Sequence, residues 1–218
     1  MSHDAAAHHE AHHPALAHHF DSLAQQSEAT TLGMWVFLVT EVLFFGGLFA
    51  TYMIYRSWYP DAFAAASHEL DVTLGTINTV VLITSSLTMA LAVHAAQLGQ
   101  RKALMLFLIA TMILGGAFLG IKSVEYYHKF AEHHVPGLDF RFEKAHILHA
   151  QLFFSLYFVM TGLHALHVVA GIGANLWAMA GAARVGDAMM AGRCRALSLY
   201  WVLVDIVWLI IFGLMYLL

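Results

Sequence analysis

Five long apolar segments, separated by shorter polar stretches, dominate the hydrophobic pattern of this chain. Each segment reaches or exceeds the roughly 20 residues that an α-helix needs to cross a bilayer. None shows the alternation of a β-strand, and only helices and closed barrels can span a membrane. The pattern therefore predicts an all-α, polytopic membrane helix bundle. We expect five transmembrane helices at about residues 32–56, 73–97, 103–127, 147–180 and 196–218.

The connections between these segments differ in character. We expect four loops: an acidic one at 57–72, a tight basic turn at 98–102, a mixed-charge loop at 128–146 and a small basic loop at 181–195. Thr30 or Thr31 should cap the first helix and Asp71 the second, because each directly precedes an apolar run.

Residues 1–30 form a polar N-terminal stretch that is rich in Ala and His and contains no Lys or Arg. Seven of the 16 histidines of the chain lie here: His3, His8, His9, His12, His13, His18 and His19. Some His-rich tracts bind metal ions. The composition favours a solvated tail, and the orientation argued below would place it on the cytoplasmic side.

Composition supports the membrane class and excludes other classes. Of the 218 residues, 60% are hydrophobic and 11% are charged, and the mean hydropathy is +0.69. These values are too apolar for an ordinary soluble domain. The net charge of -4 gives no indication of nucleic-acid binding. Cys194 is the only cysteine, which excludes an internal disulfide and a multi-cysteine metal site.

The basic residues divide equally between the two ends of the predicted bundle. One end holds Arg101, Lys102, Arg184, Arg193 and Arg195, and the other holds Arg56, Lys122, Lys129, Arg141 and Lys144. A raw count therefore does not set the orientation. Because Lys122 lies inside an apolar segment and the first set lies in compact loops, we expect that first end to be cytoplasmic. The C-terminus would then be periplasmic.

Carboxylates and imidazoles inside the apolar segments are the candidate functional residues. A charge near the middle of a spanning helix, such as Glu41, costs several kcal/mol unless it is paired or protonated. Glu41 and Asp205 both lie about 14 Å from the starts of two helices that run in the same direction. His164 and His167 share a face near the middle of the fourth helix. We therefore expect a buried polar layer in which imidazoles meet one or both carboxylates.

Several roles remain open for these residues. His164 and His167 could form structural hydrogen bonds, ligate a metal or haem, or transfer protons. Structural hydrogen bonding is favoured, because a haem with two histidine ligands in a bundle usually takes them from different helices. Glu41 is either a paired or protonated structural carboxylate or part of a proton pathway.

Lys122 and Glu125 lie three residues apart near the outer end of the third helix. We expect a local ion pair that lets Lys122 reach the membrane interface. Gly116 and Gly120 just before them would permit close helix packing. Aromatic residues near helix ends are expected at the interfaces: Trp35, Trp58, Tyr59, Tyr126, Tyr127, Trp177 and Trp201.

The sequence contains no recognisable phosphate-binding loop, nucleophile elbow or catalytic triad. A small bundle with few polar groups suits a subunit of a larger complex better than a self-contained enzyme.

An ordered set of motifs runs through all five apolar segments. The first is residues 32–46, LGMWVFLVTEVLFFG, which includes Trp35 and Glu41. The others follow in order: Ile77, Asn78, Thr79, Ser85, Ser86, Leu87, Thr88, Glu125, Tyr126, Thr161, Gly162, His164, His167, Val168, Tyr200, Trp201, Asp205 and Trp208. Over residues 32–218 the chain resembles subunit III of haem–copper oxidases in its short five-helix bacterial form. Two positions depart from that family: Val202, where it usually has His, and Lys122, where it usually has Gln.

The resemblance implies a non-catalytic subunit of a proton-pumping cytochrome c oxidase in the bacterial inner membrane. Haem and copper would belong to partner subunits, and this chain would bind no cofactor or metal itself. Its five helices would form two groups with a phospholipid-binding cleft between them. It would pack mainly against subunit I, with subunit II and further subunits nearby, and would support proton uptake. Glu41 looks like the family's intramembrane carboxylate, and a glutamate there resembles the cytochrome c-oxidising branch more than the quinol-oxidising one.

Two hypotheses from other classes are kept beside this one. The first is a haem-binding membrane redox subunit that uses His164 and His167. The second is a small proton or ion carrier that uses Glu41 and Asp205.

Overall fold

The computed structural model describes residues 20–137, 139–142, 147–182 and 186–218. The elements are α2 (Leu23–Trp58), α3 (Pro60–Ser67), α4 (Val72–Gln97), α5 (Arg101–Ala131), α6 (Ile147–Gly181), α7 (Asp187–Phe212) and the π-helical turn η1 (Gly213–Leu217). Across these residues, five helices are long and apolar enough to cross a membrane: α2, α4, α5, α6 and α7 with η1. The predicted all-α polytopic bundle is confirmed.

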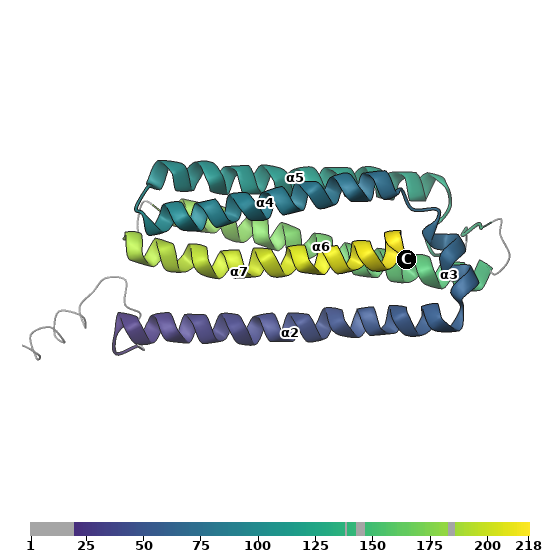
Figure 1. The fold of residues 1–218 in the computed structure, drawn as a ribbon, viewed down its shortest axis with the longest axis horizontal. Coiled ribbons are helices and arrows are strands. Elements are labelled where there is room, and N and C mark those ends of the chain that lie inside the picture. Colours follow the sequence, from purple (N-terminus) through teal and green to yellow (C-terminus); the bar gives the residue numbers. More distant parts are fainter. Residues whose placement is uncertain (1–19, 138, 143–146, 183–185) are drawn as a thin grey trace, which may run out of the picture.

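Helices α4 to α7 lie side by side, and α2 runs along one side of this group (Figure 1). The short helix α3 lies at the end of the bundle where α2 ends. Only 11% of the most apolar window of α2 is buried, against 39% for α6 and for α7. Helix α2 is therefore attached through a few contacts, and most of its surface faces outward.

Two helices begin earlier than the apolar pattern predicts. Helix α2 starts at Leu23 rather than at residue 32, and its N-cap is Ser22, whose Oγ accepts from the Gln25 N–H at 3.2 Å. The prediction that Thr30 or Thr31 caps this helix is wrong, because Thr30 lies within it and donates to the Gln26 carbonyl. The polar stretch predicted at 1–30 is thus helical from Leu23 onward. Its seven histidines lie outside the described residues.

Helix α7 likewise starts at Asp187 rather than at residue 196, so Arg193 and Arg195 are helical. Its first turns bury Met190 and the free thiol Cys194. Hydropathy locates the part of a helix that suits the membrane, whereas polar residues with good helix propensity extend the helix beyond it. Arg184 and Lys144 fall outside the described residues.

The connection at 57–72 is not an open loop, because it contains α3. Pro60 occupies the first turn of α3, where its missing N–H costs nothing. Phe63 is fully buried and contacts the ring of Tyr52 at 5.5 Å. The predicted cap of the next helix is confirmed: Asp71 Oδ1 accepts from the Leu74 N–H at 3.0 Å.

Lys129, near the end of α5, fixes this same end of the bundle. Its buried ammonium donates to the Glu69 carbonyl at 2.6 Å and to Glu132 Oε2 at 2.5 Å. Partial burial acts to raise the pKa of Glu132, but the hydrogen bond and charge of Lys129, with a smaller contribution from His134, hold that pKa below its usual value.

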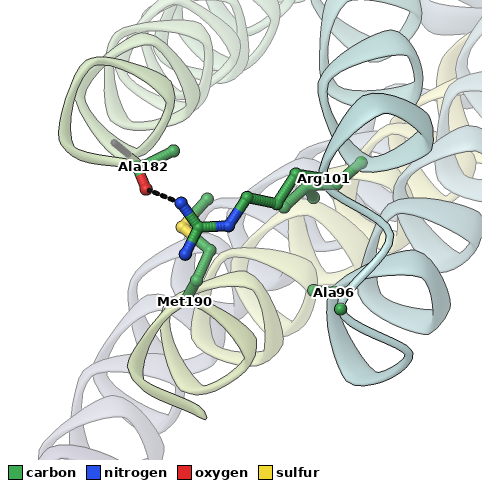
Figure 2. A pocket seen from close by; sticks show the side chains of 6 residues that line it. Ala96, Arg101, Ala182 and Met190 are labelled. Carbon is green, nitrogen blue, oxygen red and sulfur yellow. Dashed lines mark hydrogen bonds between the residues drawn. The ribbon is translucent and has the colours of Figure 1, made fainter. Parts of the chain in front are cut away.

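The two predicted basic loops meet at the opposite end. Arg101, at the start of α5, donates from Nη1 to the carbonyl of Ala182 just beyond α6, at 3.3 Å (Figure 2). Met190 and Ala96 line the small hollow beside this contact. Its volume of about 10 Å³ is about that of a single water probe.

Trp201 interlocks the inner helices and is not the interfacial residue that its position predicts. It is 1% exposed, and its indole N–H donates to Ser85 Oγ on α4 at 2.9 Å. A Cβ added at Gly115 or Gly171 would lie 3.0 or 2.8 Å from the Trp201 ring. The two glycines therefore make room for the indole. Gly116 and Gly120, predicted to permit close packing, have no such neighbour. Trp35, Trp58, Tyr127 and Trp177 are exposed.

This arrangement predicts opposite outcomes for two glycines on α6. Gly171→Ala should lower the free energy of unfolding by about 1–3 kcal/mol, because the added methyl meets a rigid ring held from its other side. Gly173→Ala is the matched control, since a Cβ there meets nothing within 4 Å. It should leave stability unchanged or raise it by up to about 1 kcal/mol. Denaturant unfolding of the purified variants measures both changes. Equal changes in unfolding free energy would contradict the close fit of Trp201 against Gly171.

Candidate functional site

Glu41 and His167 form a pair between α2 and α6. Glu41 Oε2 lies 3.0 Å from His167 Nε2, and His167 Nδ1 lies 2.7 Å from the Leu163 carbonyl. A carbonyl only accepts, so Nδ1 carries a proton. A second proton then lies between Nε2 and Oε2, as either an imidazolium–carboxylate pair or a neutral imidazole with a carboxylic acid. The pair is net neutral in both forms, which is how a carboxylate can persist inside a membrane.

The surroundings of this pair join three helices. The Phe45 ring on α2 meets the His167 ring edge-on, with centroids 5.2 Å apart. Tyr200 on α7 donates its hydroxyl to the His167 carbonyl at 2.8 Å and contacts Phe37 on α2. The prediction that an imidazole meets an intramembrane carboxylate is thus confirmed for Glu41 and His167. Both side chains keep slight exposure, 17% and 18%.

His164 and Asp205 do not join this pair, so the expected meeting of imidazoles and carboxylates is limited to His167 and Glu41. The His164 ring is fully buried, 5.3 Å from the Phe118 centroid and 5.4 Å from the Trp208 centroid. Neither of its nitrogens has a hydrogen-bond partner in the described part of the chain. Asp205 Oδ2 instead accepts from Ser86 on α4. Residues three apart on a helix point about 60° apart, so His167 meets α2 while His164 enters the core of the other four helices.

A second buried site surrounds Lys122. Its ammonium donates to Glu125 Oε2 at 3.0 Å, to the Tyr157 hydroxyl at 3.1 Å and to the Tyr216 hydroxyl at 2.9 Å. Tyr157 and Tyr216 in turn donate to Glu125 Oε1. All three N–H groups of the ammonium and all four side chains are therefore satisfied within one net-neutral cluster.

The predicted ion pair of Lys122 and Glu125 is confirmed, but its predicted position at the interface is wrong. The two residues are 4% and 1% exposed. The rings of Tyr126, Tyr157, Trp208 and Tyr216 lie 4.8–5.5 Å from the Lys122 nitrogen. Cation–π attraction adds to the hydrogen bonds, and the rings close the route along which the side chain would reach water.

The turn η1 supplies one of the partners that sequence reasoning missed. It directs Tyr216 towards Lys122, and the Leu214 carbonyl within it accepts from Tyr52 on α2 at 2.8 Å. Tyr157 was missed as well. It lies on the face of α6 that also carries Thr161, four residues later, and His164, three residues after Thr161. This helical spacing could have identified it. Thr161 donates to the Tyr157 carbonyl and accepts from Tyr126, at 2.6 and 2.5 Å.

The remaining motif residues, apart from the exposed Trp35, have structural contacts. Thr79 Oγ1 accepts from the Trp208 indole at 3.0 Å, and Asn78 donates to the Phe118 carbonyl at 3.5 Å. Gly162 faces the Tyr126 hydroxyl, and Trp35 is exposed.

Metal ligation finds little support in this geometry. Over the described ranges, no group of three or more His, Cys, Asp or Glu side chains could hold a metal ion. Both ring nitrogens of His167 are engaged, so this residue offers none to an iron atom. That counts against the hypothesis of a haem held by His164 and His167.

Comparison with known proteins gives one consistent result. The family model for cytochrome c oxidase subunit III matches residues 16–218. Cytochrome bo(3) ubiquinol oxidase subunit 3 of Pseudomonas aeruginosa is 28% identical over 206 residues, covering 93% of this chain and 91% of that protein. Probable quinol oxidase subunit 3 of Staphylococcus epidermidis is 30% identical over 206 residues, covering 92% and 94%. The Staphylococcus aureus protein with the same description is 29% identical over 200 residues, covering 90% and 92%.

The contacts of the two histidines predict different effects of the same substitution. His167→Leu should lower the free energy of unfolding by about 1–3 kcal/mol, because it leaves Glu41 without its partner. His164→Leu removes no hydrogen bond and relieves a buried imidazole of its desolvation cost, so stability should change by less than about 1 kcal/mol or rise. Denaturant unfolding of the two purified variants measures both changes in unfolding free energy. A loss at His164 as large as that at His167 would contradict the assignment.

The Lys122 cluster predicts a strongly non-additive pair of substitutions. Lys122→Met should cost about 3–5 kcal/mol of unfolding free energy, because Glu125 is left as an uncompensated buried charge. Adding Glu125→Gln should restore most of that loss, since the amide is neutral and still accepts from both tyrosines. Lys102→Met, at an exposed lysine, is the control and should stay within about 0.5 kcal/mol. A double-mutant cycle measures the coupling, and simple additivity would refute it.

Proposed function

The chain belongs to the cytochrome c oxidase subunit III family, and from this membership we propose that it is a non-catalytic subunit of a proton-pumping terminal oxidase that reduces O2 to water. In this proposal haem and copper belong to partner subunits. The chain packs mainly against subunit I, which it stabilises, with subunit II and further subunits nearby. The observation that carries the proposal is a family match that runs through all five spanning helices.

The Glu41–His167 pair gives the proposed role a chemical basis. One proton lies between Nε2 and Oε2 at 3.0 Å, and it can move between them without changing the net charge of the pair. Both side chains keep some exposure. A pair of this kind can hold and release a proton beside the pathway of a partner subunit, which supports a contribution to proton uptake.

The phospholipid cleft between helix groups that we propose would lie beside α2. Little of α2 is buried, and large apolar side chains such as Val39 and Leu43 are exposed on it. Lipid chains in this position would cover apolar surface that the helices do not bury against each other.

We propose cytochrome c as the electron donor of the complex, with quinol as the second candidate. The glutamate at position 41 and the family description favour cytochrome c. The names of the Pseudomonas and Staphylococcus relatives favour quinol.

The proposed location is the bacterial inner membrane, with the N-terminus in the cytoplasm and the C-terminus in the periplasm. Arg101, Lys102, Arg193 and Arg195 lie at the end of the bundle that holds the start of α2, whereas Lys122 and Lys129 of the opposite set are buried. Basic residues near the membrane surface therefore favour the first end as the cytoplasmic side.

Co-purification from native membranes in mild detergent tests the proposal. A tagged chain should bring down a haem-containing subunit I, identified by its optical spectrum and by mass spectrometry. The complex should consume O2 with reduced cytochrome c, and faster than with a ubiquinol analogue. A chain recovered only without haem-containing partners would refute the proposed function, whereas a preference for quinol would overturn only the donor.

Glu41→Gln tests the role of the carboxylate within that complex. The amide can still donate to His167, so assembly should be retained, but it cannot release a proton. We expect slower proton uptake and a shorter active lifetime during turnover. Glu28→Gln, at an exposed carboxylate of the same helix, is the matched control. If proton uptake and active lifetime equal those of the control, Glu41 has a purely structural role.

A further inference from the structure

The contact between Glu41 and His167 depends on the proton that the two side chains share. The His167 ring faces two acceptors, the Glu41 carboxylate at 3.0 Å and the Leu163 carbonyl at 2.7 Å. Both contacts are hydrogen bonds only if two protons lie between the ring and its partners. With one proton removed, one contact sets two lone pairs against each other, and the pair carries a net negative charge inside the membrane.

Of the two partners of His167, Glu41 is the one that can move away. The Leu163 carbonyl is fixed in α6, one helical turn before His167, whereas Glu41 belongs to α2, of which little surface is buried. The other polar side chains of the adjoining stretch of α2, Thr40 and Thr51, donate to carbonyls of α2 itself. Loss of the shared proton therefore removes a polar attachment of α2 at mid-span, and it favours a carboxylate that reaches water.

A second attachment holds α2 one part of its length further on. The buried Tyr52 donates its hydroxyl to the Leu214 carbonyl at 2.8 Å. Its ring lies 5.5 Å from that of Phe63 on α3 and 6.2 Å from that of Phe153 on α6. These contacts involve neither Glu41 nor His167, so loss of the shared proton leaves this end of α2 attached.

Two adjacent glycines separate the two attachments. Gly46 and Gly47 lie within α2, between Glu41 and Tyr52. A Cβ at either position would meet nothing within 4 Å, so packing does not require glycine at these positions. Adjacent small residues without side-chain support weaken a helix interior and are places where helices bend. The chain thus has a joint between the part of α2 that Glu41 holds and the part that Tyr52 holds.

Three other titratable side chains lie on the helices packed against this part of α2: Tyr200 and Asp205 on α7 and His164 on α6. The Tyr200 hydroxyl donates to the His167 carbonyl, whereas Asp205 accepts from α4 and His164 enters the core. In the described part of the chain, none of the three bonds to the Glu41 carboxylate. Helix α3 lies at the other end of α2 (Figure 1). A response that needs the carboxyl group of Glu41 can therefore be separated from these groups by substitution.

We propose that the Glu41–His167 pair is a proton-dependent latch for α2. With the shared proton in place, the latch is closed and Glu41 holds α2 to α6. When the proton leaves, the Glu41 carboxylate turns towards water, and the N-terminal part of α2 swings outward about Gly46 and Gly47 while Tyr52 stays attached. The latch rests on the proton-holding role proposed for this pair. It gives that role a consequence, because release of one proton changes the surface that α2 presents to a partner subunit.

Distances between spin labels on the full chain in nanodiscs test the latch. After Cys194→Ser removes the only native thiol, labels are attached at Glu28→Cys on α2 and Lys102→Cys on α5, two exposed positions at the same end of the bundle. Glu28 lies about 27 Å along the helix from Gly46, so a bend of about 15° moves it by about 7 Å. Because the closed state holds the proton, the label distance should lengthen by about this amount as the pH rises from about 6 to about 10, and shorten again on return.

Variants of the labelled chain separate the latch from other effects of pH. Glu41→Gln supplies an amide that donates to His167 without titrating, so the distance should keep its closed value at every pH. His164→Leu is the control on α6 and should keep the wild-type response. Gly46→Ala combined with Gly47→Ala stiffens the joint without a clash and should reduce the change in distance at least about twofold.

A second pair of labels, at Ser57→Cys and Phe130→Cys, reports on the attached end of α2 and should show no change with pH. A wild-type distance between the first labels that does not change with pH, an equal response in Glu41→Gln, or a full response in the double glycine variant would each overturn the latch. These outcomes leave the proposed function open to its own test. Slower proton uptake in Glu41→Gln together with a distance that is independent of pH would support the proton-holding role and refute the latch.

Discussion

A bilayer offers no water to a buried polar group, and this constraint explains most of the side-chain arrangement. Lys122 is the clearest case, because its ammonium lies inside the bundle with no route to solvent. The structure neutralises it with Glu125 and satisfies both groups with two tyrosine hydroxyls. One of these tyrosines, Tyr216, lies in the π-helical turn η1 that follows α7. The end of the last helix thus contributes directly to satisfying the buried charge.

The same requirement accounts for the attachment of α2, which has little apolar contact with the other helices. Glu41 is paired with His167 at mid-span, and Tyr52 and Arg56 bond to Leu214 and Leu218 near the far end. Polar contacts thus fix the depth and rotation of α2 while most of its surface stays available. Such a helix suits a supporting subunit, because its free faces can meet lipids and partner subunits.

Packing between α4, α5, α6 and α7 follows a different rule, in which shape matters more than charge. Trp201 fits between Gly115 and Gly171 and donates to Ser85, so one indole sets the distances among four helices. His164 lies in this tightly packed region without a hydrogen-bond partner among the described residues. The two parts of the protein, a rigid four-helix group and a loosely attached α2, thus rely on different interactions.

The sequence by itself determined the class of fold, the five spanning helices, the Asp71 cap and the ion pair of Lys122 with Glu125. Each of these depends on local composition or on spacing within one helix, which a sequence states directly. Only the tertiary structure decided that His167 rather than His164 meets Glu41, that Asp205 turns to Ser86, and that Tyr157 and Tyr216 enclose Lys122. These contacts depend on how each helix is rotated against its neighbours. The fit of Trp201 against Gly115 and Gly171, which are distant in the sequence, is one such contact, and no local pattern records it.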